Sequence, residues 1–204
     1  MSQLPAASTH PGVRRTQSAR ILGRWMVSFV GYPLGGYAAF LVFGPVDGPG
    51  TALAGGLLTG VTIGAVQAWA MGQARPGPRT WITATSLGLM AGVAAGAELV
   101  DYETNLSSLI VQGAVSGALV GVAQATVLLP TLGRRFLAWP LLLSVTFALG
   151  WTVTTYAGID VDQQFTIFGS SGALVAALLT AVLPLWLTSH QEPKGWSSGP
   201  ETSR

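Results

Sequence analysis

The sequence predicts an all-α integral membrane protein whose six transmembrane helices form three helical hairpins of the same orientation, a pseudo-threefold bundle. Three observations predict this fold: few charged residues, long uncharged apolar segments and an internal repeat. Only 9% of the residues are charged and 50% are hydrophobic, whereas a soluble domain usually carries about 25% charged residues. There are too few charges to cover a surface exposed to water.

Six apolar segments each approach the roughly 20 residues that cross a bilayer core. The first follows a polar stretch, 1–20, which we expect to be a disordered cytoplasmic tail, and residues 188–204 form a second expected tail. The first segment is too long for a signal-peptide core, so we expect it to be retained. Pro and Gly mark most joints. The predicted spans are 21–43, 51–71, 81–100, 107–129, 137–156 and 166–187.

The charges between these spans predict the orientation. All ten Lys and Arg residues fall on one side of a six-span arrangement, which the positive-inside rule assigns to the cytoplasm. The charged residues in the loops of the other side are all acidic: Asp47, Asp101, Glu103, Asp160 and Asp162. We therefore expect a multi-pass protein of the cell membrane with both termini cytoplasmic. Because the basic residues form short clusters rather than one basic face, nucleic acid is not an expected partner.

A pattern of small residues recurs in the second, fourth and sixth spans. Every fourth position is small, and a polar residue follows the last of them by three positions. The small residues are Gly56, Gly60, Gly64, Gly113, Gly117, Gly121, Gly169, Ala173 and Ala177, and the polar residues are Gln67, Gln124 and Thr180. Residues four apart share one helix face, so each run predicts a packing seam that another backbone can approach closely. The alternative is a groove that admits a lipid tail or a partner helix.

The three polar residues are the best candidates for a ligand site. Gln67, Gln124 and Thr180 lie near the cytoplasmic ends of their spans, and a buried amide in hydrocarbon needs a partner. The simpler interpretation is that they form hydrogen bonds between helices. The alternative is a polar collar near the pseudo-axis that binds a small solute, a lipid headgroup or water.

Glu98 is the only carboxylate inside a predicted span, and ionisable residues within membranes are functional candidates. Its place near the outer interface favours a hydrated carboxylate, and the alternative is a cation or proton site. Pro33 and Pro184 can kink the first and last spans. Most tryptophans lie toward the inner span ends, where we expect an aromatic belt at headgroup depth. They are Trp25, Trp69, Trp81, Trp139 and Trp186.

The sequence lacks the residues that intramembrane catalysis requires. It contains no Cys, and its two histidines, His10 and His190, lie in the polar tails. No Lys, Arg or pair of carboxylates lies deep in a predicted span, so general acid–base, metal-assisted and phosphoryl-transfer chemistry lack their groups. We expect no enzymatic activity, no cofactor and no metal site.

The repeated G-x-x-x-G-x-x-x-G-x-x-Q pattern, with Trp near the start of the next hairpin after a short basic loop, resembles a set of uncharacterised bacterial multi-pass membrane proteins. The resemblance covers Trp25 to Leu187. It implies a fold style and a prokaryotic inner membrane, and it implies no activity. The third repeat departs from the pattern because Thr180 replaces the Gln.

Two functions remain in competition. The first is a non-enzymatic membrane protein that acts through helix packing with membrane lipid, with other membrane proteins or with itself. The second is a small-solute transporter, or the substrate-binding membrane subunit of one. A ligand-sized cavity lined by Gln67, Gln124 and Thr180 favours the transporter, whereas a solid core at that depth favours the first function.

Overall fold

The computed structural model describes residues 11–72 and 76–189, and every regular element within these ranges is a helix. Six helical segments are long and apolar enough to cross a membrane, which confirms the prediction of an all-helical, multi-pass membrane protein. Most of the two expected tails, 1–10 and 190–204, lies outside the described residues. The spans are Ala19–Phe43, Pro49–Met71, Pro78–Leu99, Leu106–Pro130, Phe136–Tyr156 and Ser170–Leu187.

The first span, Ala19–Phe43, is interrupted, and its helix begins well before the span itself. The helical segment consists of α1 (Pro11–Val27), the 3-10 turn η1 (Ser28–Val30) and α2 (Gly31–Phe43). Residues 11–20, expected in a disordered tail, are therefore helical, and Pro11 occupies the first helical position, to which proline is suited. The interruption at η1 precedes Pro33, which has no N–H to donate to the preceding turn.

The last span is also interrupted, and it begins later than the expected residue 166. It consists of α7 (Ser170–Thr180) and α8 (Val182–Ser189), and the break between them precedes Pro184. Gly169 holds an extended backbone conformation, and its N–H donates to Thr154 Oγ1 at 3.1 Å instead of continuing a helix. Residues 157–169 consequently form an irregular connection.

The middle helices have clear start and stop signals. They are α3 (Pro49–Met71), α4 (Pro78–Leu99), α5 (Leu106–Leu132) and α6 (Trp139–Tyr156), the last preceded by the 3-10 turn η2 (Arg134–Ala138). A proline occupies the first or second position of α3, α4 and α6, where a missing N–H costs nothing. Gly72 and Gly133 end α3 and α5 with positive φ angles of 64° and 76°, which only glycine adopts readily.

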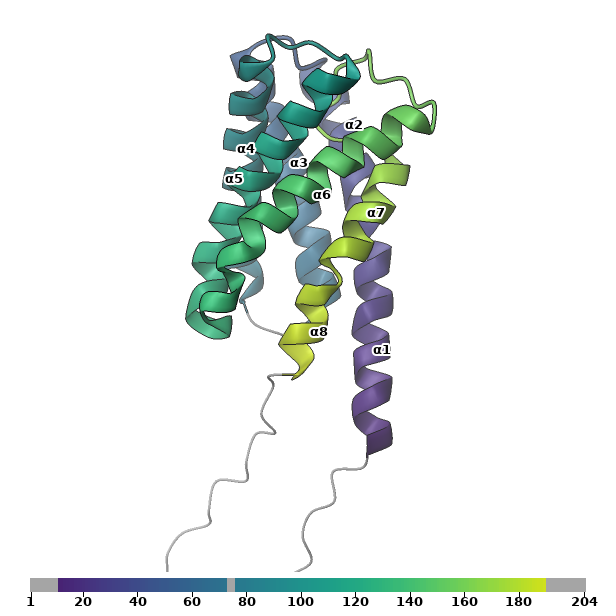
Figure 1. Ribbon diagram of the computed structural model, residues 1–204, viewed down its shortest axis with the longest axis vertical. Helices are drawn as coiled ribbons and strands as arrows, with labels where there is room; N and C mark the ends of the chain where they lie inside the picture. The colour runs from purple at the N-terminus through teal and green to yellow at the C-terminus, as the bar shows by residue number, and fades with distance from the viewer. Residues whose placement is uncertain (1–10, 73–75, 190–204) are drawn as a thin grey trace, which may run out of the picture.

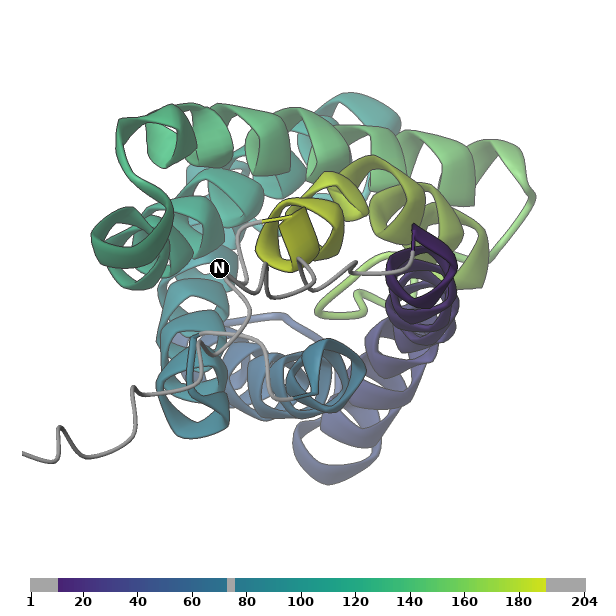
Figure 2. The same cartoon turned by 90° about the horizontal axis from the view of Figure 1, so that it is seen from below.

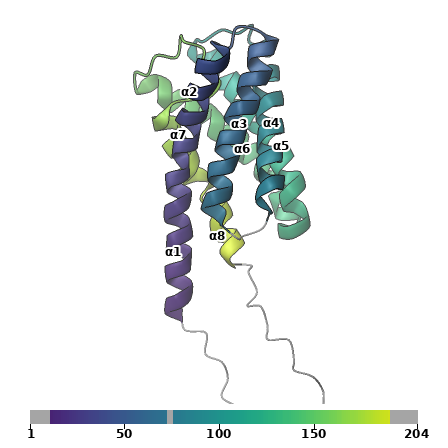
Figure 3. The same cartoon turned by 180° about the vertical axis from the view of Figure 1, so that it is seen from behind.

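The helices follow one another around a closed ring. Each helix from α2 to α6 packs against the next in the chain, while α7 and α8 pack against the first span. Figure 1 and Figure 3 show these helices side by side, and Figure 2 shows them surrounding a central axis. The start of α1 and the end of α8 lie at the same end of the bundle (Figure 1).

The two ends of the bundle differ in charge. The connections 44–48, 100–105 and 157–169 meet at one end (Figure 1), here called the acidic end because it carries Asp47, Asp101, Glu103, Asp160 and Asp162. The joints that carry Arg79 and Arg134 lie at the opposite, basic end.

Hydrogen bonds between loops close the acidic end. Val46 N donates to Gln164 O at 2.9 Å, and Gln164 Nε2 donates to Tyr102 O at 2.9 Å. Thr104 Oγ1 also donates to Asp162 Oδ1 at 3.2 Å. The three connections are thus tied to one another above the bundle.

Candidate functional site

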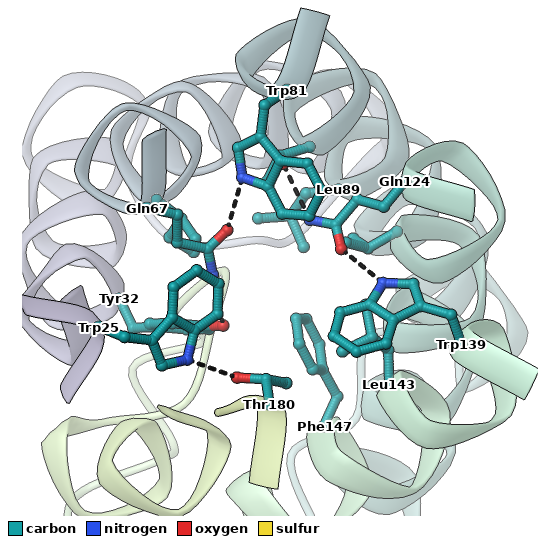
Figure 4. Close-up of a pocket in the computed structure, with 13 residues that line it drawn as sticks. Trp25, Tyr32, Gln67, Trp81, Leu89, Gln124, Trp139, Leu143, Phe147 and Thr180 are labelled. Atoms are coloured by element: carbon teal, nitrogen blue, oxygen red, sulfur yellow. Dashed lines mark hydrogen bonds between the residues drawn. The ribbon is translucent and has the colours of Figure 1, made fainter. Parts of the chain in front are cut away.

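The three predicted collar residues are buried inside the bundle, and each accepts a hydrogen bond from a tryptophan. Trp81 Nε1 donates to Gln67 Oε1 at 3.1 Å, and Trp139 Nε1 donates to Gln124 Oε1 at 2.9 Å. In the third group Trp25 Nε1 lies 3.3 Å from Thr180 Oγ1 and 3.1 Å from the carbonyl oxygen of Ala177. Figure 4 shows the three indoles and their partners around one small space.

The remaining polar atoms of the collar also have partners within the protein. Gln67 Nε2 donates to the Tyr32 hydroxyl at 3.4 Å, and Gln124 Nε2 donates to Thr85 Oγ1 at 2.9 Å. Thr180 Oγ1 donates to the carbonyl oxygen of Ala176 at 2.6 Å. Because an unpaired amide or indole is costly in an apolar environment, these bonds stabilise the collar without a ligand.

The prediction that the inner tryptophans form an aromatic belt is wrong for three of them. Trp25, Trp81 and Trp139 are buried in the bundle core. Trp69 is 53% exposed, as a belt residue would be, and its ring lies 4.5 Å from the Arg24 guanidinium. A tryptophan near a helix end fits either role, and only the rotation of the helix decides which face it occupies.

Sequence reasoning missed the tryptophan–glutamine pairs, although a signal for them exists. Gln67 and Trp81 are separated by 14 residues and Gln124 and Trp139 by 15. This nearly constant separation spans the basic joint of each pair of helices. It places the end of one helix beside the start of the next and so brings the two side chains together.

The space that the collar surrounds is small. Its volume is about 10 Å³, close to the roughly 10–15 Å³ that a single water requires. Aromatic rings fill the axis beyond it, because Phe168 stacks on Tyr32 at 5.3 Å between centroids and meets Phe147 edge-on at 5.2 Å. The bundle axis therefore has a nearly solid core at the depth of the collar.

The predicted seam of α3 lies against α4. A Cβ atom added at Gly60 would lie 2.6 Å from Ser86 Cα, and one added at Gly56 would lie 2.8 Å from Leu89 O. A Cβ atom added at Gly64 would lie 3.0 Å from the backbone Cα of Ile82 in α4. Distances below 3.0 Å are shorter than carbon atoms tolerate, so the two backbones touch only because these residues are glycines.

The predicted seam of α5 lies against α6 in the same manner. A Cβ atom at Gly113 would lie 2.8 Å from Phe147 O. Gly117 and Gly121 face the backbone of the same helix even more closely. Three further glycines of α4 face the backbone of α5, namely Gly88, Gly92 and Gly96.

The third predicted seam is different from the other two. Gly169 precedes α7 rather than lying within it, and an added Cβ would meet the Ile159 side chain at 2.7 Å. Ala173 and Ala177 lie within α7 and are buried. The close contact of α7 with α6 is made instead at Gly172, where an added Cβ would meet the backbone of Gly150.

Glu98 is exposed at the end of α4, and its carboxylate accepts a hydrogen bond of 2.6 Å from the Tyr102 hydroxyl. This hydrogen bond is the main cause that raises the pKa of Tyr102 to about 12, and partial burial and the nearby carboxylates act in the same direction. Within the described residues no group of three or more His, Asp or Glu residues could hold a metal ion.

A larger pocket, here called the flank pocket, lies between α2, the end of α6 and the irregular connection before α7. Its volume is about 380 Å³, within the roughly 300–1,000 Å³ range of small-molecule sites. No sequence motif pointed to it, because it arises where the late start of α7 leaves room beside α2. Its lining includes Leu34, Tyr37, Trp151, Asp160, Phe165 and Phe168.

Comparison with protein-family models, with curated proteins and with solved structures finds no match to this chain. The collar, the seams and the flank pocket are therefore the features of this chain that bear on its function.

Proposed function

We propose that the protein is a non-enzymatic integral membrane protein that acts at its outer surface, through contacts with membrane lipid, with other membrane proteins or with a second copy. The observation that carries this proposal is the closed core. The collar surrounds only about 10 Å³, and each of its amide and indole groups already has a partner. Such a core stabilises a scaffold and offers a solute no binding site.

We further propose that the three hairpins are parallel repeats around a pseudo-threefold axis. The tryptophan contacts support this, since α4 and α6 each donate an indole N–H to the preceding helix of the ring. The first span donates its indole to α7, which precedes it in the closed ring. The contacts of the α3 and α5 glycines add to this support.

The proposed location is the cell membrane, with both termini in the cytoplasm. The concentration of carboxylates at one end of the bundle and of arginines at the other supports this orientation. In the proposed orientation the acidic end lies outside. Nucleic acid is not a proposed partner.

The proposed lack of enzymatic activity rests on the chemistry of the described core. Its buried polar side chains are Ser, Thr and Gln together with the Tyr32 hydroxyl, and none of these groups ionises near neutral pH. A transporter, the competing function, needs an axial space for its substrate, and about 10 Å³ is far below the roughly 300 Å³ of a small ligand site.

Cysteine accessibility tests the closed core against the transporter. The chain has no native Cys, so a Leu89→Cys variant carries a single thiol at a buried residue that lines the collar space. We expect no reaction with a membrane-impermeant thiol reagent from either side, in intact cells or in inverted vesicles. A transporter exposes such a position in at least one state, so labelling of this thiol in the folded protein would contradict the proposal. Asp101→Cys, in an exposed loop, is the matched positive control.

A further inference from the structure

We propose that the flank pocket binds one phospholipid, with an acyl chain inside the pocket and a primary ammonium headgroup against Asp160. The inference rests on the proposed function, and it specifies which class of lipid binds at the outer surface of the protein. It is carried by three observations: the shape and lining of the pocket, its opening toward the flank, and the carboxylate at its rim.

The floor of the pocket is apolar and preformed. Trp151 and Phe168 are both buried, and their rings meet edge-on with centroids 6.2 Å apart. Phe165 extends the apolar lining, and its ring packs against Phe40 at 4.9 Å. Rigid aromatic rings cannot collapse to fill the space, so burial of methylene groups there is favourable.

The pocket opens on the flank of the bundle rather than toward its axis. Leu34 and Tyr37, which line it, are 59% and 57% exposed on α2. The neighbouring exposed positions of α2 are also apolar, as Leu41 and Val42 show. In a membrane such a surface faces hydrocarbon, and an acyl chain can enter the pocket sideways without crossing water.

The rim of the pocket selects the headgroup. Asp160 lines the pocket, and its two carboxylate oxygens each accept one hydrogen bond, from Asp162 N at 3.1 Å and from Gln163 Nε2 at 3.0 Å. An ionised carboxylate has about four acceptor positions, so it can accept further N–H donors. No Lys or Arg belongs to the described residues that line the pocket, and a headgroup that carries an ammonium group is therefore favoured over one with only negative charge.

A primary ammonium group fits this rim better than a quaternary one. It donates charge-assisted hydrogen bonds to a carboxylate, whereas a choline group has no N–H to donate. Phosphatidylethanolamine combines this headgroup with the acyl chain that the pocket accommodates, and phosphatidylglycerol has the chain without the cation. The two lipids share the acyl chains and the phosphate, and they differ in the terminal group, an ammonium in one and an uncharged glycerol in the other.

Native mass spectrometry of the full chain tests the proposal. The protein is reconstituted in nanodiscs with equal amounts of phosphatidylethanolamine and phosphatidylglycerol, transferred to mild detergent, and its retained lipids are counted. We expect one retained phosphatidylethanolamine per chain. Filling the pocket with Leu34→Trp or Ser170→Trp should abolish this retention. Leu41→Trp and Leu178→Trp, at exposed positions of the same helices that do not line the pocket, should retain it.

Loss of one charge separates the headgroup from the acyl chain. In Asp160→Asn we expect the preference for phosphatidylethanolamine over phosphatidylglycerol to fall by about tenfold, the effect of one charge-assisted hydrogen bond. Asp101→Asn removes the same charge from the same end of the bundle, away from the pocket, and should keep the preference. Size-exclusion chromatography shows that each variant is folded.

Three results would overturn the proposal: equal retention by the filled and control variants, equal retention of both lipids by the parent protein, or a dimer that only the pocket-filling variants lose. The last result would assign the pocket to a second copy of the chain. An unreactive Leu89→Cys thiol together with any of these results would remove the lipid site and leave the closed core in place. A reactive thiol would instead count against the proposed function.

Discussion

At the scale of single residues, the interior is organised by two kinds of hydrogen-bonding side chain: those that can only donate and those that both donate and accept. An indole N–H is a donor with no acceptor capacity, whereas a glutamine side chain offers an oxygen and two N–H donors. Gln124 therefore connects Trp139 on one side with Thr85 on the other. Each such bond joins two helices, and it fixes their rotation as well as their separation.

A double-mutant cycle measures the Trp81–Gln67 bond. Trp81→Phe and Gln67→Leu each leave one buried partner unpaired, so each should lower the free energy of unfolding by about 1–3 kcal/mol. The double variant should be less destabilised than the sum, with a coupling energy of about 0.6–1.7 kcal/mol. Reversible unfolding in bicelles gives these values. Tyr156→Phe, at an exposed position, should change little, and strict additivity of the two core changes would show that the bond contributes nothing.

Titration of Tyr102 tests the contact with Glu98 at the acidic end. Its pKa is raised from 10.0 to about 12, chiefly because the Glu98 carboxylate accepts a hydrogen bond from the neutral hydroxyl. The bond therefore stabilises the fold fully below pH 10 and is lost as the pH rises toward 12. The phenolate absorbance, isolated as the difference between the parent protein and Tyr102→Phe, should appear near pH 12. In Glu98→Gln it should move back toward pH 10, and an unmoved titration would exclude this contact.

At the scale of helices, the contacts are made by backbone against backbone. Association within a bilayer gains little from the hydrophobic effect, so close packing supplies much of the stabilisation. The glycines of α3 and α5 allow this approach, and several large residues of the same helices, such as Leu57 and Val122, are exposed on the outside of the bundle. The closest contacts between neighbouring helices are therefore made at small residues.

Alanine substitutions test the contact of α3 with α4. A single methyl group at Gly60 would lie 2.6 Å from Ser86 Cα, so Gly60→Ala should force the backbones apart and lower the free energy of unfolding by about 1–3 kcal/mol. Gly50 lies in the same helix with nothing within 4 Å of an added Cβ. Gly50→Ala should be neutral or slightly stabilising, because alanine favours helix formation. Equal unfolding curves for both variants would contradict the close contact.

The helices themselves could be predicted from the sequence because length and hydropathy define a membrane span almost independently of its neighbours. The ends of α3 and α5 could be predicted equally well, since Gly72 and Gly133 adopt backbone angles that favour glycine. The start of α7 could not be predicted from the sequence. The segment before it is apolar enough to read as helix, and only the hydrogen bond from Gly169 N to Thr154 shows that it remains irregular.

The candidate site could be predicted only in part. The glutamines were found because a polar residue stands out in an apolar span, whereas the tryptophans were assigned to a belt because their position along the helix fits one. Trp81 is buried and Trp69 exposed at the same end of the bundle, and their difference depends on helix rotation. The flank pocket depends on the placement of three separate segments, for which the sequence carries no pattern.

At the scale of the whole molecule, charge is separated between the two ends of the bundle. The acidic end is closed by hydrogen bonds among three loops. At the basic end, the Arg24 guanidinium contacts the Trp69 ring and donates to the Trp69 carbonyl oxygen. This contact connects the first span to the end of α3. Charge asymmetry of this kind determines how a helical protein inserts.

Cysteine labelling tests the proposed topology. A thiol introduced at Asp47, Asp101 or Asp162 should react with an impermeant reagent added outside intact cells, because these residues are exposed at the acidic end. A thiol at Thr80, exposed at the basic end, should react only after the membrane is opened. The opposite pattern would invert the orientation, and labelling of both ends from outside would mean that α3 and α4 do not cross the membrane.

The bond between Trp25 and the last span has a consequence for how the protein is made. Its acceptors lie more than 150 residues further along the chain, so four further spans are synthesised before the indole of the first can be paired. Until then the indole N–H of Trp25 lacks the acceptors that it has in the complete bundle. Because this bond needs the last span, we expect a chain truncated before α7 to leave the ring of helices open and the Trp25 indole without these acceptors.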